Sequence, residues 1–194
     1  MTRVMSSCLA LCTLAACGGG LSDEEIAEVF AAQGVVSSDV TTEVSTAIQQ
    51  DGITGKDLEF GGNYQSWTLS GDLEGKGVIW DGVIGVDGNG SMTDTTQEFD
   101  LGLTYEDVQA VGHDAILNGD LDQGWTLTSE GQTYHAEYDM VGDLKVSGGI
   151  KGRAKIDFSM TLDYDPASGF TYEYEGTING RDVNELQGSG DMTM

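Results

Sequence analysis

Apolar and polar residues alternate along most of the chain from Leu58 onward. The segment 99–105 shows this alternation, which returns at 134–144 and over the longer segment 150–164. A period of two is typical of a strand with one face on a core and the other face in water. The alternation therefore predicts a mainly β domain over residues 58–194.

Short glycine-rich turn signals separate the alternating segments. Among them are Asp87-Gly88-Asn89-Gly90, Ser147-Gly148-Gly149 and Asn179-Gly180, which are typical of hairpin turns. Because such connections leave no room for crossover helices, we expect an antiparallel up-and-down meander. Counting the segments between turns predicts about eight or nine strands.

Glycines also occur inside the predicted strands, where they cost stability unless the sheet bends or another chain segment comes close. We interpret them as sites of curvature, so that the sheet wraps into a barrel or half-barrel. The concave side would hold the apolar residues and could receive an N-terminal helix. The glycines concerned are Gly82, Gly85, Gly102, Gly142, Gly152 and Gly176.

The segment 23–50 is predicted to be helical. Ser22 and Glu25 form the pattern of a capping box, and apolar residues recur at helical spacing after it. Gly34 predicts the end of this helix. A second helix is predicted between Gly34 and residue 50, although its Val and Thr content also permits a strand. We therefore expect one or two N-terminal helices.

Residues 1–16 have the pattern of a secretory signal peptide, because Arg3 is followed by an apolar run that ends just before Cys17. The run is shorter than the ~20 residues that a membrane-spanning helix needs. Leu14-Ala15-Ala16-Cys17 resembles the lipobox of bacterial lipoproteins. The resemblance implies cleavage before Cys17 and acylation of that cysteine, with residues 17–22 as the lipidated tether.

The other cysteines fit a lipobox less well. Leu11 stands before Cys12 where a small residue is preferred, and Cys8 has almost no apolar segment ahead of it. In the enterobacterial sorting rule an aspartate after the cysteine favours the inner membrane, whereas this chain has Gly18. The resemblance implies a lipid-anchored protein of the bacterial cell envelope, with the outer membrane preferred.

The charge balance excludes one class of partner. The 194 residues include 8 Lys and Arg against 33 Asp and Glu, for a formal net charge of −25. A phosphate backbone would be repelled over most of such a surface. We therefore expect no nucleic-acid partner.

The segment 87–98 is the one candidate metal site. It places oxygen-bearing side chains at the spacing of an EF-hand loop, but the position that requires glycine is Met92, and its flanks read as strands instead of helices. A glycine-rich hairpin explains the segment more simply, so Ca²⁺ binding is a lesser alternative, and no other cofactor is predicted. The candidate ligands are Asp87, Asn89, Ser91, Thr93 and Glu98.

No motif for nucleophilic, phosphate-binding or dinucleotide-binding chemistry occurs in the sequence. His113 and His135 have no partner at metal-ligand spacing and are predicted to be solvated surface residues. Most large aromatic side chains are predicted to face the core. These are Trp67, Trp80, Trp125, Phe158, Phe170, Tyr172 and Tyr174.

The segment 150–164 has the clearest division into two faces. Ile156 and Phe158 belong to its apolar face, and Lys151, Arg153 and Lys155 belong to its polar face. We predict that the basic residues lie opposite acidic residues of neighbouring strands. The expected acidic neighbours are Glu137, Asp139, Glu173 and Glu175.

The sequence thus predicts a lipid-anchored envelope protein that acts as a structural or interaction module, without catalysis. Its expected partners are the membrane, through the lipid anchor, and another envelope protein. The alternative is a half-barrel carrier or binder of an apolar small molecule, an analogy of architecture alone. An enclosed apolar pocket of several hundred cubic ångströms favours the carrier, whereas a tightly filled interior favours the module.

Overall fold

The computed structural model describes residues 20–49, 58–63 and 65–188. Within these residues the chain forms two helices and nine strands. The elements are α1 (Asp23–Gln49), β1 (Leu58–Asn63), β2 (Ser66–Glu74), β3 (Trp80–Met92), β4 (Thr96–Ala110), β5 (Ala115–Glu130), β6 (Thr133–Gly148), β7 (Gly152–Asp165), β8 (Gly169–Ile178), β9 (Arg181–Asp182) and α2 (Val183–Gly188).

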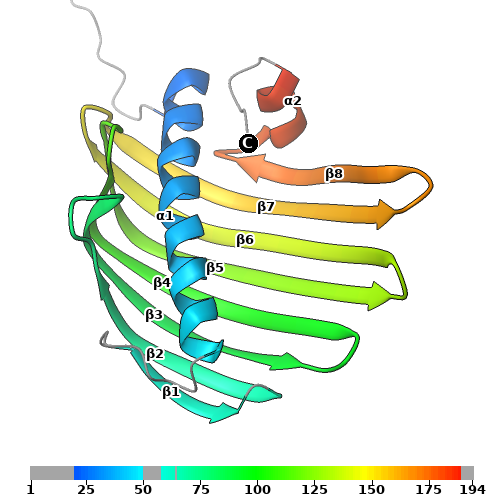
Figure 1. The fold of residues 1–194 in the computed structure, drawn as a ribbon. Helices are drawn as coiled ribbons and strands as arrows, with labels where there is room; N and C mark the ends of the chain where they lie inside the picture. The colour runs from blue at the N-terminus through cyan, green and yellow to red at the C-terminus, as the bar shows by residue number, and fades with distance from the viewer. Residues whose placement is uncertain (1–19, 50–57, 64, 189–194) are drawn as a thin grey trace, which may run out of the picture.

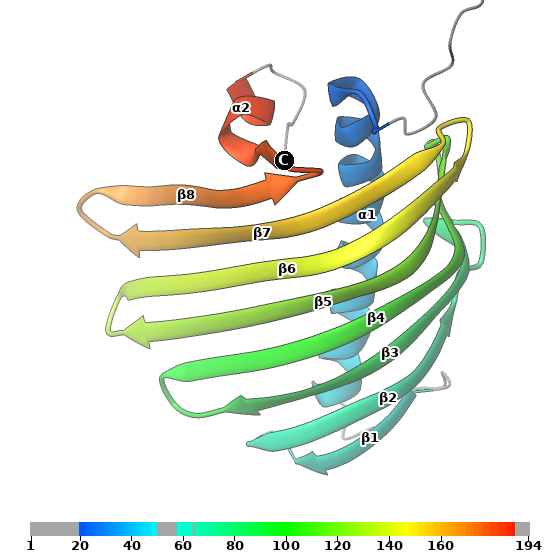
Figure 2. The same ribbon diagram turned by 180° about the vertical axis from the view of Figure 1, so that it is seen from behind.

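All nine strands belong to one antiparallel sheet in which each strand pairs with its neighbours in sequence. Figures 1 and 2 show the sheet curving around α1, with its first and last strands far apart. The prediction of a mainly β antiparallel meander of about eight or nine strands is therefore confirmed. The curved sheet is an open half-barrel, and it does not close into a barrel.

The bend of the sheet has a local cause in β3 and β4. The pairing register shifts between Asp81 and Val83 of β3, and it shifts again in β4 where Asp107 has a φ of 53°. Gly82 has a φ of 108°, and a Cβ added there would lie 2.5 Å from the carbonyl oxygen of Asp107. Only glycine fits this position, so Gly82 marks a bulge that bends the strand.

Helix α1 begins with the predicted capping box. The backbone N–H of Ser22 donates to Glu25 Oε2 at 2.8 Å, and the N–H of Glu25 donates to Ser22 Oγ at 3.3 Å. Apolar side chains along one stripe of the helix are buried against the concave face of the sheet. They include Ile26, Val29, Val36, Val40 and Val44.

The predicted end of this helix at Gly34 is wrong, because α1 continues to Gln49 as a single helix. Gly34 lies on the exposed side, whereas Val36 and Val40 continue the buried stripe beyond it. A glycine costs a helix about 1 kcal/mol relative to alanine, which the burial of two valines outweighs. The strand alternative for the second half of the segment is also wrong.

The C-terminal part of the β domain contains a short helix that the sequence analysis missed. After the two residues of β9, Asp182 Oδ1 accepts the backbone N–H of Asn184 at 2.8 Å and caps α2. Val183, at the start of α2, is fully buried. Arg181 forms an ion pair with Asp23, which joins β9 to the first turn of α1.

Strand β7 has the predicted faces but different acidic neighbours. Ile156 and Phe158 are buried, and Lys155 is exposed on the convex face. Arg153 makes a bidentate pair with Asp143, at 2.9 and 2.8 Å, and Lys155 also lies opposite Asp143. The four acids expected there lie instead opposite Ser159 and Thr161, because the strand register is displaced from the one assumed. These acids are Glu137, Asp139, Glu173 and Glu175.

Candidate ligand groove

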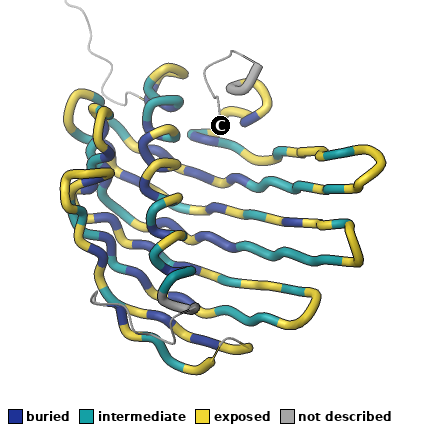
Figure 3. The backbone as a smooth tube through the Cα atoms, viewed as in Figure 1, coloured by how far each residue is buried: buried dark blue, intermediate teal, exposed yellow. Residues whose placement is uncertain are grey.

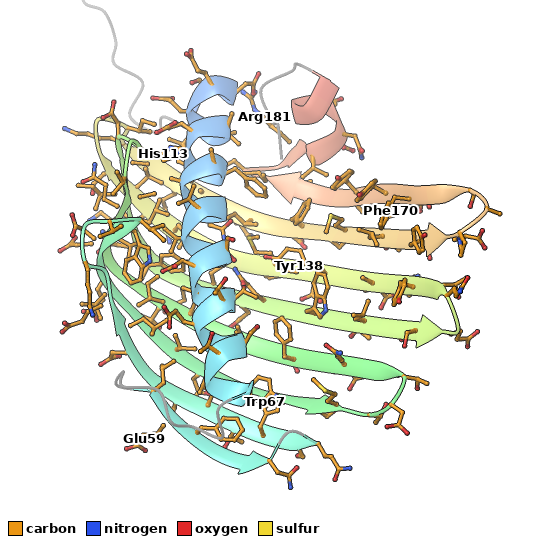
Figure 4. All side chains as sticks on the ribbon, in the orientation of Figure 1. Glu59, Trp67, His113, Tyr138, Phe170 and Arg181 are labelled. Atoms are coloured by element: carbon orange, nitrogen blue, oxygen red, sulfur yellow. The ribbon has the colours of Figure 1, made fainter. Side chains whose placement is uncertain are left out.

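Helix α1 covers only part of the concave face. Between α1 and strands β4 to β7 an open groove of about 440 Å³ remains, and Tyr138 of β6 lies along it (Figure 4). Figure 3 shows that the strand positions behind α1 are the most deeply buried, whereas the hairpin ends on the right of the view are more exposed. The groove therefore begins where the packing against the helix ends.

A row of aromatic rings, one from each of five successive strands, runs across the concave face, and its first four rings form one wall of the groove. Phe99 of β4 stacks on Trp125 of β5, with ring centroids 6.3 Å apart and planes 12° apart. Trp125 meets Tyr138 of β6 edge to face at 6.2 Å. Phe158 of β7 then lies 6.2 Å from both Tyr138 and Tyr174 of β8. We call these five residues the aromatic row.

The other wall is the polar side of α1. Ser37 Oγ donates to Gln123 Oε1 at 3.2 Å, and Gln123 Nε2 donates to Ser37 Oγ at 2.9 Å, so this contact joins the helix to β5. Among the described residues, the side chains that line the groove include no Lys, Arg, Asp or Glu. They are Phe30, Gln33, Ser37, Ser38, Thr41, Thr42, Phe99, Gln123, Trp125, Tyr138, Met140, Phe158 and Met160, with Gly34 completing the wall.

Two buried polar groups near this interface lie beside each other. They are the amide of Gln33, which lines the groove, and the hydroxyl of Tyr105. Burial raises the pKa of Tyr105 to about 12, although a side-chain hydrogen bond from Gln33 lowers it, and burial also raises the pKa of Tyr138. Both phenols are therefore neutral at physiological pH, and the groove presents uncharged polar groups beside aromatic rings.

The aromatic prediction is confirmed for three residues and wrong for two, whereas Trp125 and Tyr174 are only partly buried. Trp67, Trp80 and Phe158 are buried, and the indole N–H of Trp80 donates to Asp39 Oδ2 at 2.9 Å. Phe170 and Tyr172 of β8 are 59% and 51% exposed. Both pair with residues of the apolar face of β7, as expected, but Phe170 lies beyond the region that α1 covers (Figure 4).

The five candidate calcium ligands do not form a loop. Asp87, Asn89 and Ser91 follow one another along the convex side of β3, and Thr93 lies in the turn before β4. Only Ser91 and Glu98 are directly opposite each other. At about 3.3 Å per residue, Asp87 and Ser91 are too far apart to share an ion whose ligands lie within about 2.6 Å. Among the described residues, no three His, Cys, Asp or Glu side chains are grouped to hold a metal ion.

The two histidines have different surroundings. His113 is not a solvated surface residue as predicted, because its Nδ1 lies 3.1 Å from Glu28 Oε1 of α1 and its side chain is 19% exposed. The backbone N–H of Asp114 donates to the same oxygen at 3.1 Å. His135 is exposed as predicted, and its Nδ1 lies 2.7 Å from Asp163 Oδ1.

We expect the pKa of His135 to lie above its ordinary value, because Asp163 and then Glu137 hydrogen-bond its ring. A raised folded-state pKa stabilises the fold below about pH 6.5, and this contribution is lost as the pH rises through the folded-state pKa. The effect on stability is small, because the ring is 45% exposed. An NMR titration of the His135 ring tests this. Asp163→Asn should lower its pKa more than Glu137→Gln does, and equal effects would contradict the assignment.

Comparisons of the chain with protein-family models, curated proteins and solved structures gave no match. Neither of the helices in the described part of the chain is long and apolar enough to cross a membrane. Cys17, the predicted lipidation site, lies outside the described residues.

Proposed function

We propose that the mature chain is a lipid-anchored binding protein of the bacterial cell envelope, and that its groove beside α1 binds an apolar ligand without catalysis. One observation carries the proposal: four members of the aromatic row, all except Tyr174, line an open groove of about 440 Å³ together with Phe30 and two methionines. This volume lies within the range of about 300 to 1,000 Å³ that is usual for small-molecule sites. Of the two functions predicted from the sequence, the groove supports the binder of an apolar molecule.

The polar wall indicates which kind of apolar molecule fits. Because no charged side chain lines the groove, an ionised head group would lose its hydration without gaining a partner there. The polar groups that line the groove, among them those of Gln33, Ser38 and Thr41, are uncharged amides and hydroxyls, which suit a neutral ester or amide group. The proposed ligand is therefore a neutral amphiphile in which an ester or amide group joins an apolar chain, such as an uncharged acyl lipid.

Gly34 offers a test that leaves the core intact. A Cβ added to Gly34 would have no atom within 4 Å, so Gly34→Trp can fill the groove from the helix side without a clash. Val35→Trp is the matched control, because Val35 is on the same helix and does not line the groove. Tryptophan has a higher helix propensity than glycine and about the same helix propensity as valine, so neither substitution should weaken α1.

The measurement is the affinity of the neutral dye N-phenylnaphthylamine for a chain that starts at Gly18. This chain contains all of the described fold, and without the lipid anchor no detergent is needed to compete with the dye. We expect Gly34→Trp to weaken binding at least about tenfold and Val35→Trp to leave it unchanged. Equal binding by the two variants, or no binding by the unchanged chain, would contradict the proposal.

The lipid anchor has its own test. Cys17→Ser removes the only proposed acyl acceptor, so labelled palmitate should enter the unchanged chain and be absent from the variant. The uncut precursor of the variant should also accumulate. Incorporation of palmitate into Cys17→Ser at the level of the unchanged chain would refute the lipoprotein interpretation. Gly18 after the cysteine is the reason to expect the outer membrane.

A further inference from the structure

The position beside β8 in the sheet is only partly filled. Ile178 and Thr177 pair with Arg181 and Asp182 of β9, and the chain then leaves the sheet to form α2. Within the described residues no strand pairs with β8 from Gly169 to Gly176 on the side away from β7. Strand β9 therefore covers only the end of β8, and the described residues supply no further strand along this edge.

The backbone groups that face this open edge can be assigned from the pairing. The backbone N–H of Asn179, just after β8, donates to the carbonyl oxygen of Lys155 in β7. The backbone N–H and C=O groups of odd-numbered residues in β8 therefore point towards β7. The side-chain amide of Asn184 in α2 donates to the carbonyl oxygen of Tyr174 at 3.0 Å. The backbone N–H and C=O groups of even-numbered residues in β8 therefore point towards the open edge. Phe170 and Tyr172 thus direct their N–H and C=O groups to the open edge, and Asn184 marks where α2 closes it.

Side chains next to this edge differ between the two faces of the sheet. On the concave side Phe170 and Tyr172 are largely exposed, with ring centroids 6.3 Å apart. On the convex side Glu173 and Glu175 are exposed and take part in no ion pair within the described residues. A strand that pairs here would meet aromatic rings on one face and unpaired carboxylates on the other.

The geometry points to the open edge of β8 as a docking site for an extended segment of another protein, in which apolar and basic residues alternate. Such a segment would continue the sheet beyond β9 by backbone hydrogen bonds, which is the mode of β-strand addition. Its apolar residues would cover Phe170 and Tyr172, and its basic residues would face Glu173 and Glu175. This site is separate from the groove, and it serves the interaction function that the sequence predicted.

A second copy of the chain is a poorer occupant of this edge. Both copies would carry a net charge of −25. If β8 paired with its own copy around Tyr172, the two Glu173 side chains would become diagonal neighbours about 7 to 8 Å apart. The charge of the edge thus favours a basic partner over an identical one.

The experiment uses the full-length protein and a capped peptide of about ten residues that alternates valine and lysine. The control peptide has glutamate in place of lysine. Amide exchange by NMR has an internal reference, because the N–H groups of Thr171 and Glu173 already face β7. We expect the lysine peptide to slow exchange at Phe170 and Tyr172 and to leave Thr171 and Glu173 protected as before. The glutamate peptide should have no effect.

Two substitutions at Tyr172 distinguish the contribution of the backbone hydrogen bond to peptide binding from the contribution of the aromatic ring. Tyr172→Pro removes an edge-facing N–H without touching the bonds to β7, and proline is tolerated on edge strands, so the fold should persist. Tyr172→Ala loses the same ring and keeps the N–H. We expect Tyr172→Pro to bind the lysine peptide at least about tenfold more weakly than Tyr172→Ala. The double variant Glu173→Lys with Glu175→Lys should prefer the glutamate peptide.

Three results would overturn the inference. The first is equal binding of the two peptides by the unchanged protein. The second is equal binding of the lysine peptide by Tyr172→Pro and Tyr172→Ala when circular dichroism shows both to be folded. The third is a dimer in light scattering that Tyr172→Pro dissociates, because a second copy would then occupy the edge.

Discussion

Phe158→Ala should destabilise the fold by about 3 to 5 kcal/mol, which is a large part of the stability of a domain of this size. Phe158 is 4% exposed and is the meeting point of helix and sheet, because its ring contacts Phe30 of α1 edge to face at 5.6 Å. It also contacts Tyr138 and Tyr174 of the neighbouring strands. Truncation removes buried area and leaves a cavity that these rigid rings cannot fill.

Lys155→Ala is the matched control for this prediction. Lys155 belongs to the same strand, but it lies on the convex face, where its loss should cost less than about 1 kcal/mol. Urea unfolding of the chain that starts at Gly18 measures both costs under the same conditions. Equal costs for the two substitutions would mean that the faces of β7 are assigned wrongly.

Val36→Asp should cost about 4 kcal/mol or more, because it places an unpaired carboxylate where α1 packs on the sheet. Val36 is fully buried, whereas its neighbour Val35 is 37% exposed. Valine and aspartate have similar helix propensities, so Val35→Asp controls for any effect on the helix itself. We expect Val35→Asp to change stability by less than about 0.5 kcal/mol.

The penalty at Val36 should also depend on pH in one direction. Burial raises the folded-state pKa of the introduced carboxyl, so the penalty is complete above that pKa and disappears below about pH 3.9. Thermal unfolding of the two variants between pH 4 and pH 7 gives the difference. Equal melting temperatures of the two variants at neutral pH would show that α1 does not occupy the concave face.

Local patterns in the sequence predicted the antiparallel meander and the start of the helix, although the segment 87–90, expected to be a turn, lies within β3. The alternation of apolar residues marks the two faces of β4, β6 and β7. The capping box at Ser22 is a short-range signal that needs no knowledge of the fold. The predicted helix end at Gly34 was wrong because the helix continues through the burial of Val36 and Val40 against the sheet, whose strands are distant in the sequence.

The groove was not predictable from the same patterns. The alternation of apolar and polar residues places Phe99, Trp125 and Tyr138 on the core side of their strands. Only the pairing register of the strands puts these three residues side by side. The alternation also does not indicate how far α1 extends across the sheet, so Phe170 and Tyr172 were expected to be buried. Which aromatic residues remain accessible to a ligand therefore depends on how much of the concave face α1 covers, and not only on the face of the strand to which each residue belongs.

The content of the groove in the purified protein tests the central claim most directly. The full-length chain and Gly34→Trp would be purified in parallel from bacterial envelopes, and the bound molecules extracted and identified by mass spectrometry. We predict that a neutral acyl lipid accompanies the unchanged chain in a near-equimolar amount and is strongly depleted from Gly34→Trp. The absence of any apolar molecule, or equal amounts in the two samples, would contradict the account.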